Sequence, residues 1–194
     1  MEEKRERFLS PAELSRVGEV LREMESEGIE LASAIAAARL LILTGCRLSE
    51  IMTLQWEHVD ILGKALRLPD SKTGAKVVHL GQPAVEILEK IERIERTPWV
   101  IVGTKPNARL TDLQPFWQRV RARAGLKDVR IHDLRHTFAS VAIASGQGLP
   151  MIGKLLGHTQ VQTTARYAHL AADPVKHAAN QVASSIAASL NHAA

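Results

Sequence analysis

The sequence has few of the features on which disulfide, zinc-thiolate and membrane proteins depend. Cys46 is its single cysteine, so neither an intrachain disulfide nor a cysteine-based zinc site can form. No run of about 18 apolar residues occurs in the chain, which excludes a transmembrane helix. Residues 1–7 are mostly charged and lack the apolar segment of a secretory signal. These absences predict a reduced, cytoplasmic setting with no membrane partner.

Length and periodicity predict one mainly helical domain. The 194 residues, 45% of them apolar, are enough for a single domain with a substantial core. Most apolar residues recur at helical spacing and a few short segments alternate like strands. We therefore expect an α+β fold that is mainly α, with a small antiparallel sheet at one edge. Residues 1–172 are expected to form the domain and residues 173–194 a tail helix.

Local start and stop signals place the individual elements. Ser10-Pro11-Ala12-Glu13 is a capping box that predicts a helix ending before Gly28, and Gly45 is expected to end the next, more buried helix. Strands are expected at 59–61, 65–68, 76–80 and 98–102, and further helices at 82–94, after 111–112, from 132 or 133, from 150 to 156, and from 173. On the helix that begins near 132, the apolar face is expected to carry Leu134, Phe138 and Val141.

The stretch 131–168 gathers groups that bind or attack phosphate. His132, Arg135 and His136 share one helix face if the helix already includes position 132. If Asp133 is the N-cap instead, His132 lies just before the first turn. In both cases a guanidinium and two imidazoles surround a helix N-terminus, where backbone N–H groups favour an anion. With Tyr167 downstream, this set suits phosphoryl transfer without a metal.

The order Arg…Lys…His-x-x-Arg…Leu-Gly-His…Tyr resembles the catalytic domain of the tyrosine recombinases, the phage-integrase family. The resemblance extends from about Leu9 to Tyr167. It implies the fold of that catalytic domain for residues 1–172, and it implies DNA cleavage and rejoining through a covalent 3′-phosphotyrosyl link. The catalytic residues it implies are Arg47, Lys72, His132, Arg135, His158 and Tyr167.

Arg47 and Lys72 each have a non-functional interpretation as well as a functional one. From the residues alone, Arg47 could simply pair with Glu50 at the end of an apolar helix, and a turn lysine such as Lys72 is normally a solvated charge. The resemblance implies more: Thr-Gly-x-Arg-x-Ser-Glu would carry the first catalytic arginine, with Glu50 orienting it. Ser-Lys-Thr-Gly would carry the hairpin lysine that acts as general acid toward the departing 5′ oxygen.

The remaining residues complete one reaction. Two guanidiniums, Arg47 and Arg135, can clamp the non-bridging oxygens of a phosphodiester in a geometry that lysine cannot reproduce, and His158 adds a donor. Tyr167 is the nucleophile, and a phenol is mostly protonated at neutral pH. By resemblance, His132 is the candidate base, whereas another imidazole, His136, is expected to support the helix.

No metal or other cofactor is expected. His132 and His136 have the spacing of a zinc pair, but the glutamate of His-Glu-x-x-His is absent. Acidic clusters that would hold Mg²⁺ are also lacking, and the covalent link conserves bond energy, so ATP is not required.

Basic residues are concentrated just before the stretch 131–168. Residues 105–130 carry seven lysines and arginines against two aspartates, whereas residues 1–30 carry five basic and nine acidic residues. Alone, the basic run could be a solvated helix face; in this position a phosphate-tracking surface is favoured. Its candidate DNA contacts are Lys105, Arg109, Arg119, Arg121 and Arg123.

The implied partners are double-stranded DNA and further copies of the chain, as a tetramer on DNA at the nucleoid. The tail helix either packs on its own domain or is exchanged with a neighbouring protomer. A type IB topoisomerase-like enzyme, which religates the same strand, and a non-catalytic DNA-binding module are the alternatives. Because the N-terminal clamp typical of recombinases is missing, we expect a fragment or a minimal homologue with weak, salt-sensitive DNA binding.

Overall fold

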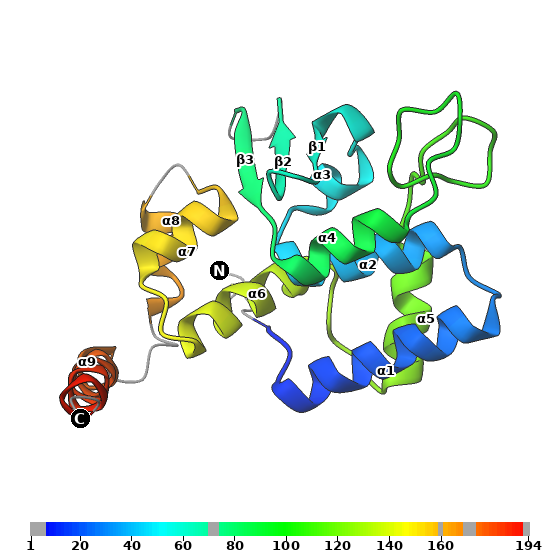
Figure 1. Cartoon of the computed structure of the whole chain (residues 1–194). Coiled ribbons are helices and arrows are strands. Elements are labelled where there is room, and N and C mark those ends of the chain that lie inside the picture. The colour runs from blue at the N-terminus through cyan, green and yellow to red at the C-terminus, as the bar shows by residue number, and fades with distance from the viewer. Residues whose placement is uncertain (1–6, 70–73, 159–160, 169–173, 192–194) are drawn as a thin grey trace.

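Helices make up most of the computed structural model, which describes residues 7–69, 74–158, 161–168 and 174–191 (Figure 1). The helices are α1 (Pro11–Glu27), α2 (Ala32–Thr44), α3 (Leu48–Met52), α4 (Gln82–Lys90), α5 (Gln114–Ala124), α6 (Asp133–Ala144), α7 (Leu149–Leu156), α8 (Val161–Ala165) and α9 (Pro174–Asn191), with a 3-10 turn η1 (Trp56–His58). The strands are β1 (Val59–Asp60), β2 (Ala65–Leu68) and β3 (Lys76–His79). This composition confirms the mainly helical fold class.

The helix ends follow local sequence signals. At the start of α1, the Ser10 hydroxyl accepts the Glu13 N–H and the Glu13 carboxylate accepts the Ser10 N–H, at 3.2 and 2.8 Å. Gly28 and Gly45 end α1 and α2 with φ values of 67° and 63°, a conformation that costs glycine little. The capping box and both glycine stops are confirmed.

The core is built around α2, which is buried along most of its length. Helix α2 packs against α4 and α6, and α1 packs against α5 (Figure 1). The largest fully buried side chain is Trp117 of α5, whose indole N–H donates to the Val129 carbonyl at 3.0 Å. This core holds the C-terminus of α2 and the N-terminus of α6 in fixed relative positions, which matters for the site described below.

The three strands form one antiparallel sheet in the order β1-β2-β3, at one edge of the helical body (Figure 1). Ala65 pairs with His79 and Leu68 pairs with Lys76. Lys76 therefore begins β3 at the end of the sheet nearest the connection between β2 and β3. The predicted small sheet and its antiparallel order are confirmed.

Two predicted elements differ in the structure. The helix expected at 82–94 ends at Lys90, with Ile91 in an extended conformation; beyond it, the Arg93 guanidinium lies 4.4 Å from the Trp56 ring centroid, a tertiary contact that local periodicity does not reveal. Within the segment 98–102, Val100 and Ile101 are buried, but the segment forms only isolated bridges, Gln55 with Trp99 and Val102 with Arg109. The Pro98 carbonyl accepts from the Trp56 N–H, the Val100 N–H donates to the Leu54 carbonyl, and the Ile101 carbonyl accepts from the Leu110 N–H, so the segment bonds irregular segments instead of a strand.

Helix α6 is buried on more than the predicted apolar face. Its N-cap is His132, and Asp133 is its first helical residue, which removes Asp133 as the N-cap. Leu134 is buried as expected, but Val141 is 48% exposed, while Arg135 and His136 are buried. The first half of α6 passes through the interior, so polar residues are enclosed there, whereas the second half exposes Val141 and buries Ala139 and Ile143.

Helix α9 lies apart from the other helices in Figure 1. Its apolar side chains Val182, Ile186 and Leu190 are 56–75% exposed. Within the described ranges, no helix combines the length and the apolar character needed to cross a membrane.

Candidate active site

Arg135 joins two helix ends that are far apart in the sequence. Its guanidinium is buried and donates through Nη1 to the Gly45 carbonyl at 2.5 Å and through Nη2 to the Leu156 carbonyl at 2.7 Å. Both carbonyls lie at helix C-termini, where the dipole favours a cation. Gly45 is two residues before Arg47, and Leu156 is two residues before His158. Arg135 therefore bonds the backbone close in sequence to Arg47 and to His158, the two other candidate phosphate ligands.

Arg47 is held by Glu50, as both sequence interpretations predicted. Its Nη1 lies 2.9 Å from Glu50 Oε1, and its backbone N–H donates to Glu50 Oε2 at 2.8 Å. Burial raises the pKa of Glu50, but bonds from Lys76 and Arg47 outweigh it and keep that pKa below its usual value. Glu50 is therefore an ionised carboxylate. The pair is compatible with an orienting role for Glu50.

Lys76 is a member of this cluster that the sequence interpretation missed. Its Nζ lies 2.8 Å from Glu50 Oε2, and its side chain is only 9% exposed. The signal that could have found it is the strand alternation: Lys76 and Val78 share one face of β3, and Val78 is buried. An inward-facing lysine needs an anionic partner, and Glu50 is that partner.

His158 follows the C-cap of α7 and faces the same cluster. Its Nδ1 lies 2.8 Å from the Thr164 hydroxyl. Burial and the positive charges of Arg135 and Arg47 lower the pKa of His158 to about 4. The imidazole is therefore neutral at pH 7. If Thr164 donates to Nδ1, the proton sits on Nε2, which can then donate to a phosphate oxygen.

Tyr167 packs in a small apolar cluster with Ile143, Ile152 and Leu156. Its hydroxyl lies 2.7 Å from Nδ1 of His136. The sequence interpretation gave the role of base to His132 and a supporting role to His136, and the imidazole seen to bond the phenol is His136. Because the two histidines are only four residues apart, their spacing does not show which of them bonds the phenol. The choice of His132 rested on the family resemblance.

The three imidazoles at the site are all kept neutral. Burial, and then the charge of Arg135, lower the pKa of His132. Burial and His132 lower the pKa of His136 to about 4, and the rings of these two histidines meet edge to face with centroids 5.0 Å apart. Arg166 adds positive charge beside both. It directly precedes Tyr167, and sequence interpretation gave it no role.

The site is electropositive although its histidines are neutral. Three cations, Arg47, Arg135 and Lys76, lie around the single carboxylate of Glu50. Burial lowers the pKa of Arg135, and the positive charge of Arg47 lowers it further. An anion binding here would relieve that repulsion. Lys72, the predicted general acid, lies outside the described residues.

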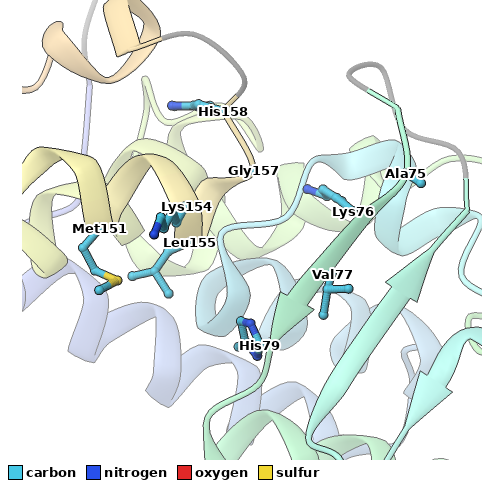
Figure 2. Close-up of a pocket in the computed structure, with 9 residues that line it drawn as sticks. All are labelled: Ala75, Lys76, Val77, His79, Met151, Lys154, Leu155, Gly157 and His158. Atoms are coloured by element: carbon cyan, nitrogen blue, oxygen red, sulfur yellow. The ribbon is translucent and has the colours of Figure 1, made fainter.

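A hollow lies between β3 and α7, beside this cluster (Figure 2). Its lining includes Lys76, His79, Lys154, Gly157 and His158. Figure 2 shows Lys76 extending from β3 toward Gly157, with His158 beyond it. The lining is therefore basic on both sides.

Helix α5 carries the predicted basic surface, but its arginines are engaged within the chain. Arg119 pairs with Glu30 at 2.5 Å and Arg123 with Glu27 at 2.7 Å, while Arg121 donates to the Val129 carbonyl at 3.1 Å. The acidic segment 1–30 and the basic segment 105–130 thus neutralise each other in part. A DNA phosphate would have to compete with these carboxylates for Arg119 and Arg123. DNA contacts by the α5 arginines stay a prediction.

The last two basic candidates lie in the loop between α4 and α5. The Arg109 guanidinium lies 6.0 Å from the Trp99 ring centroid, and Lys105 is exposed. Their contact with DNA also stays a prediction. In the part of the chain that the structure describes, no three His, Cys, Asp or Glu side chains gather in a way that could hold a metal ion.

A mainly helical domain in which one buried and one half-buried arginine, neutral imidazoles and one phenol form an anion-receptive site is suited to transfer phosphoryl groups through a tyrosine. The model of the phage integrase family matches residues 7–173. The chain belongs to that family, which confirms the resemblance found in the sequence.

Curated relatives match most of this chain. The integrase of Salmonella phage P22 is 29% identical over 194 residues, covering 92% of this chain and 48% of the relative. The tyrosine recombinase XerD of Pasteurella multocida is 30% identical over 154 residues, covering 73% and 52%. The chain therefore spans about half the length of these relatives.

Solved structures share the fold. The XerA recombinase superimposes with a TM-score of 0.70 at 23% identity, over 93% of this chain and 65% of that one. The catalytic domain of bacteriophage HP1 integrase superimposes with a TM-score of 0.64 at 22% identity, over 89% and 93%. The predicted catalytic-domain fold is confirmed.

Proposed function

We propose that this chain is the catalytic domain of a site-specific DNA recombinase, which cuts and rejoins strands through a covalent 3′-phosphotyrosyl link. The observation that carries the proposal is the position of Arg135, whose guanidinium bonds the carbonyls of Gly45 and Leu156, two residues before Arg47 and His158 respectively. A phosphodiester is a monoanion, and its transition state gathers more charge on the non-bridging oxygens. Two guanidiniums and an imidazole donor match that charge.

The proposed cleavage step balances on the residues named. The Tyr167 oxygen attacks phosphorus and forms the O–P bond while the bond from phosphorus to the 5′ oxygen breaks. The phenol proton passes to an imidazole, and the contact at 2.7 Å favours His136. Lys72 would protonate the departing 5′ oxygen. Reversal with the 5′-hydroxyl of another strand rejoins the DNA without ATP, and religation of the same strand would instead give topoisomerase activity.

Double-stranded DNA is the proposed substrate. The related XerH recombinase has been solved bound to its difH substrate before and after cleavage, and this chain shares its fold with a TM-score of 0.72 in the latter state. The electropositive cluster around Arg47 and Arg135 supports the same ligand chemistry here. The chain alone is expected to bind DNA weakly and with strong salt dependence.

Assembly on DNA is proposed to use the tail helix in trans. The side chains of Val182, Ile186 and Leu190 recur every four residues along α9 and are exposed. An exposed apolar stripe on a helix favours packing against a partner surface. A neighbouring protomer in a tetramer on DNA would supply that surface.

The test is a nicked suicide substrate carrying the native site, selected beforehand from genomic fragments that the protein retains. The wild-type chain should form a covalent adduct at Tyr167, and Tyr167→Phe should form none. Strand exchange without plasmid relaxation would separate a recombinase from a topoisomerase. An adduct that survives the Tyr167→Phe change, or no adduct on the selected site, would overturn the proposal.

A further inference from the structure

We propose that Lys76 is a positioning residue of this site, which acts through Glu50 on Arg47 and through Gly157 on the loop that carries His158. The inference rests on the proposed function and adds a residue to it. Lys76 lies on β3, whereas Arg47, Arg135 and His158 lie on or beside helices. Among the described residues, Lys76 therefore connects the sheet with the cluster of Arg47, Arg135 and His158.

Lys76 and Arg47 share the negative charge of the Glu50 carboxylate. Glu50 Oε2 accepts from Lys76 Nζ at 2.8 Å and Glu50 Oε1 accepts from Arg47 Nη1 at 2.9 Å. The carboxylate side chain is 3% exposed, so water contributes little to stabilising it. With Lys76 present, the carboxylate is shared by two cations, and Arg47 keeps a net positive field toward a phosphate. Without Lys76, Arg47 would be the main counterion of Glu50 and a weaker phosphate ligand.

The side chain of Lys76 also packs against Gly157, the C-cap of α7. Gly157 has φ +67°, and a Cβ placed there would lie 2.8 Å from Lys76 Cδ and 3.3 Å from Nζ. The aliphatic stem of Lys76 thus occupies the space that a side chain at position 157 would need. Figure 2 shows Lys76 directed at Gly157, with His158 next along the chain. The glycine of Leu-Gly-His therefore serves both the helix stop and the approach of Lys76.

Two other roles for Lys76 are less compatible with its surroundings. A direct phosphate contact requires an accessible ammonium, but the side chain is 9% exposed and already bonded to Glu50. A general acid must lie against the departing oxygen and give it a proton, whereas the Lys76 ammonium is already bonded to Glu50 Oε2 at 2.8 Å. Both roles make distinct predictions, so the experiment below separates them from positioning.

The experiment compares Lys76→Met, which keeps length without charge, with Lys76→Arg. Lys90→Met is the matched control, because Lys90 is an exposed lysine at the end of α4 and is not part of the hollow's lining. Single-turnover cleavage of the suicide substrate should be about 10–100-fold slower for Lys76→Met, as for other groups that orient a ligand, with unchanged DNA affinity. Lys76→Arg should recover most of the rate, and Lys90→Met should match the wild type.

A substrate with sulfur in place of the 5′ bridging oxygen tests the general-acid role, since a thiolate leaves without a proton. Under positioning, the Lys76→Met defect persists on this substrate. The double variant Glu50→Leu/Lys76→Met tests a merely structural role, because replacing a buried ion pair by apolar groups often preserves stability. Under positioning, the double variant folds but still cleaves slowly. If Lys76→Met does not fold, the double variant is the one that tests the role of Lys76.

Four results would overturn the inference: wild-type cleavage by Lys76→Met, recovery of its rate with the sulfur substrate, wild-type cleavage by the double variant, or lost DNA affinity with a salt slope smaller by about one. In each of these cases the wild-type chain still forms its adduct at Tyr167. Failure of the wild-type chain to form that adduct would count against the proposed function instead.

Discussion

The phenolic oxygen of Tyr167 lies 2.7 Å from Nδ1 of His136, and both side chains are buried. The apolar cluster of Ile143, Ile152 and Leu156 holds the phenol in this position. Burial and the neighbouring His132 keep His136 neutral. A neutral imidazole has one acceptor nitrogen, which is what a phenol needs when its proton leaves during attack on phosphorus.

Replacing His136 by glutamine is expected to slow adduct formation by about 10²–10⁴-fold, the usual contribution of a general base. A histidine with an ordinary pKa near 6.5 would make the wild-type rate fall below that pH. The pKa of about 4 predicts instead that the wild-type rate stays level well below it. Single-turnover cleavage across pH measures both. A larger loss in His132→Gln than in His136→Gln would return the role of base to His132.

Arg135→Lys is expected to reduce cleavage by about 10³-fold or more, because lysine keeps the charge but loses the planar clamp. Its bonds to the Gly45 and Leu156 carbonyls are also lost in part, which should lower the free energy of unfolding by about 2 kcal/mol. Suicide-substrate cleavage and urea unfolding measure the two effects. Arg39→Lys, at a surface pair with Glu25, should change neither; equal effects from both variants would refute a special role for Arg135.

Stability is expected to fall on mild acidification. Burial, with nearby cationic groups, lowers the pKa of His136 and of His158 to about 4. Their unfolded pKa is near 6.5, so between these values the unfolded chain binds more protons than the folded chain. The stability due to the neutral imidazoles is complete above about pH 6.5 and is lost as the pH falls toward about 4. Urea unfolding at several pH values should show this slope, and His158→Gln should flatten it. An unchanged slope in that variant would show that His158 does not contribute.

Ile186→Glu is expected to impair assembly on DNA without harming the fold. The Ile186 side chain is 56% exposed on α9, so a charge there costs the isolated chain little, whereas burying that charge against a neighbour would be costly. Native gel shifts on paired sites should show fewer higher complexes, with an unchanged melting temperature. Ala187→Glu, one residue along α9, is the control. A loss of melting temperature in Ile186→Glu alone would indicate packing on its own domain.

Local chemistry accounts for what the sequence predicted correctly. Ser10 and Glu13 cap a helix through their own neighbours, and Gly28, Gly45 and Gly157 stop helices because a positive φ suits glycine. The spaced motif residues also indicated the family, because residue types and their order along the chain are properties of the sequence itself. The apolar periodicity indicated a mainly helical domain with a small sheet, since burial of one face is a property of each element alone.

Contacts between distant segments decided the rest. The role of Lys76 depends on Glu50, 26 positions earlier, and the phenol bond to His136 spans 31 positions. The ion pairs of α5 with the α1 side of the molecule turned a predicted basic surface into a partly neutralised one. By itself, the sequence determined which groups are present, and it marked the helix ends that have a local cap, such as both ends of α1 and the C-terminus of α2. Only the tertiary structure decided which charges meet, because burial and Coulomb attraction act through space between residues that no local pattern connects.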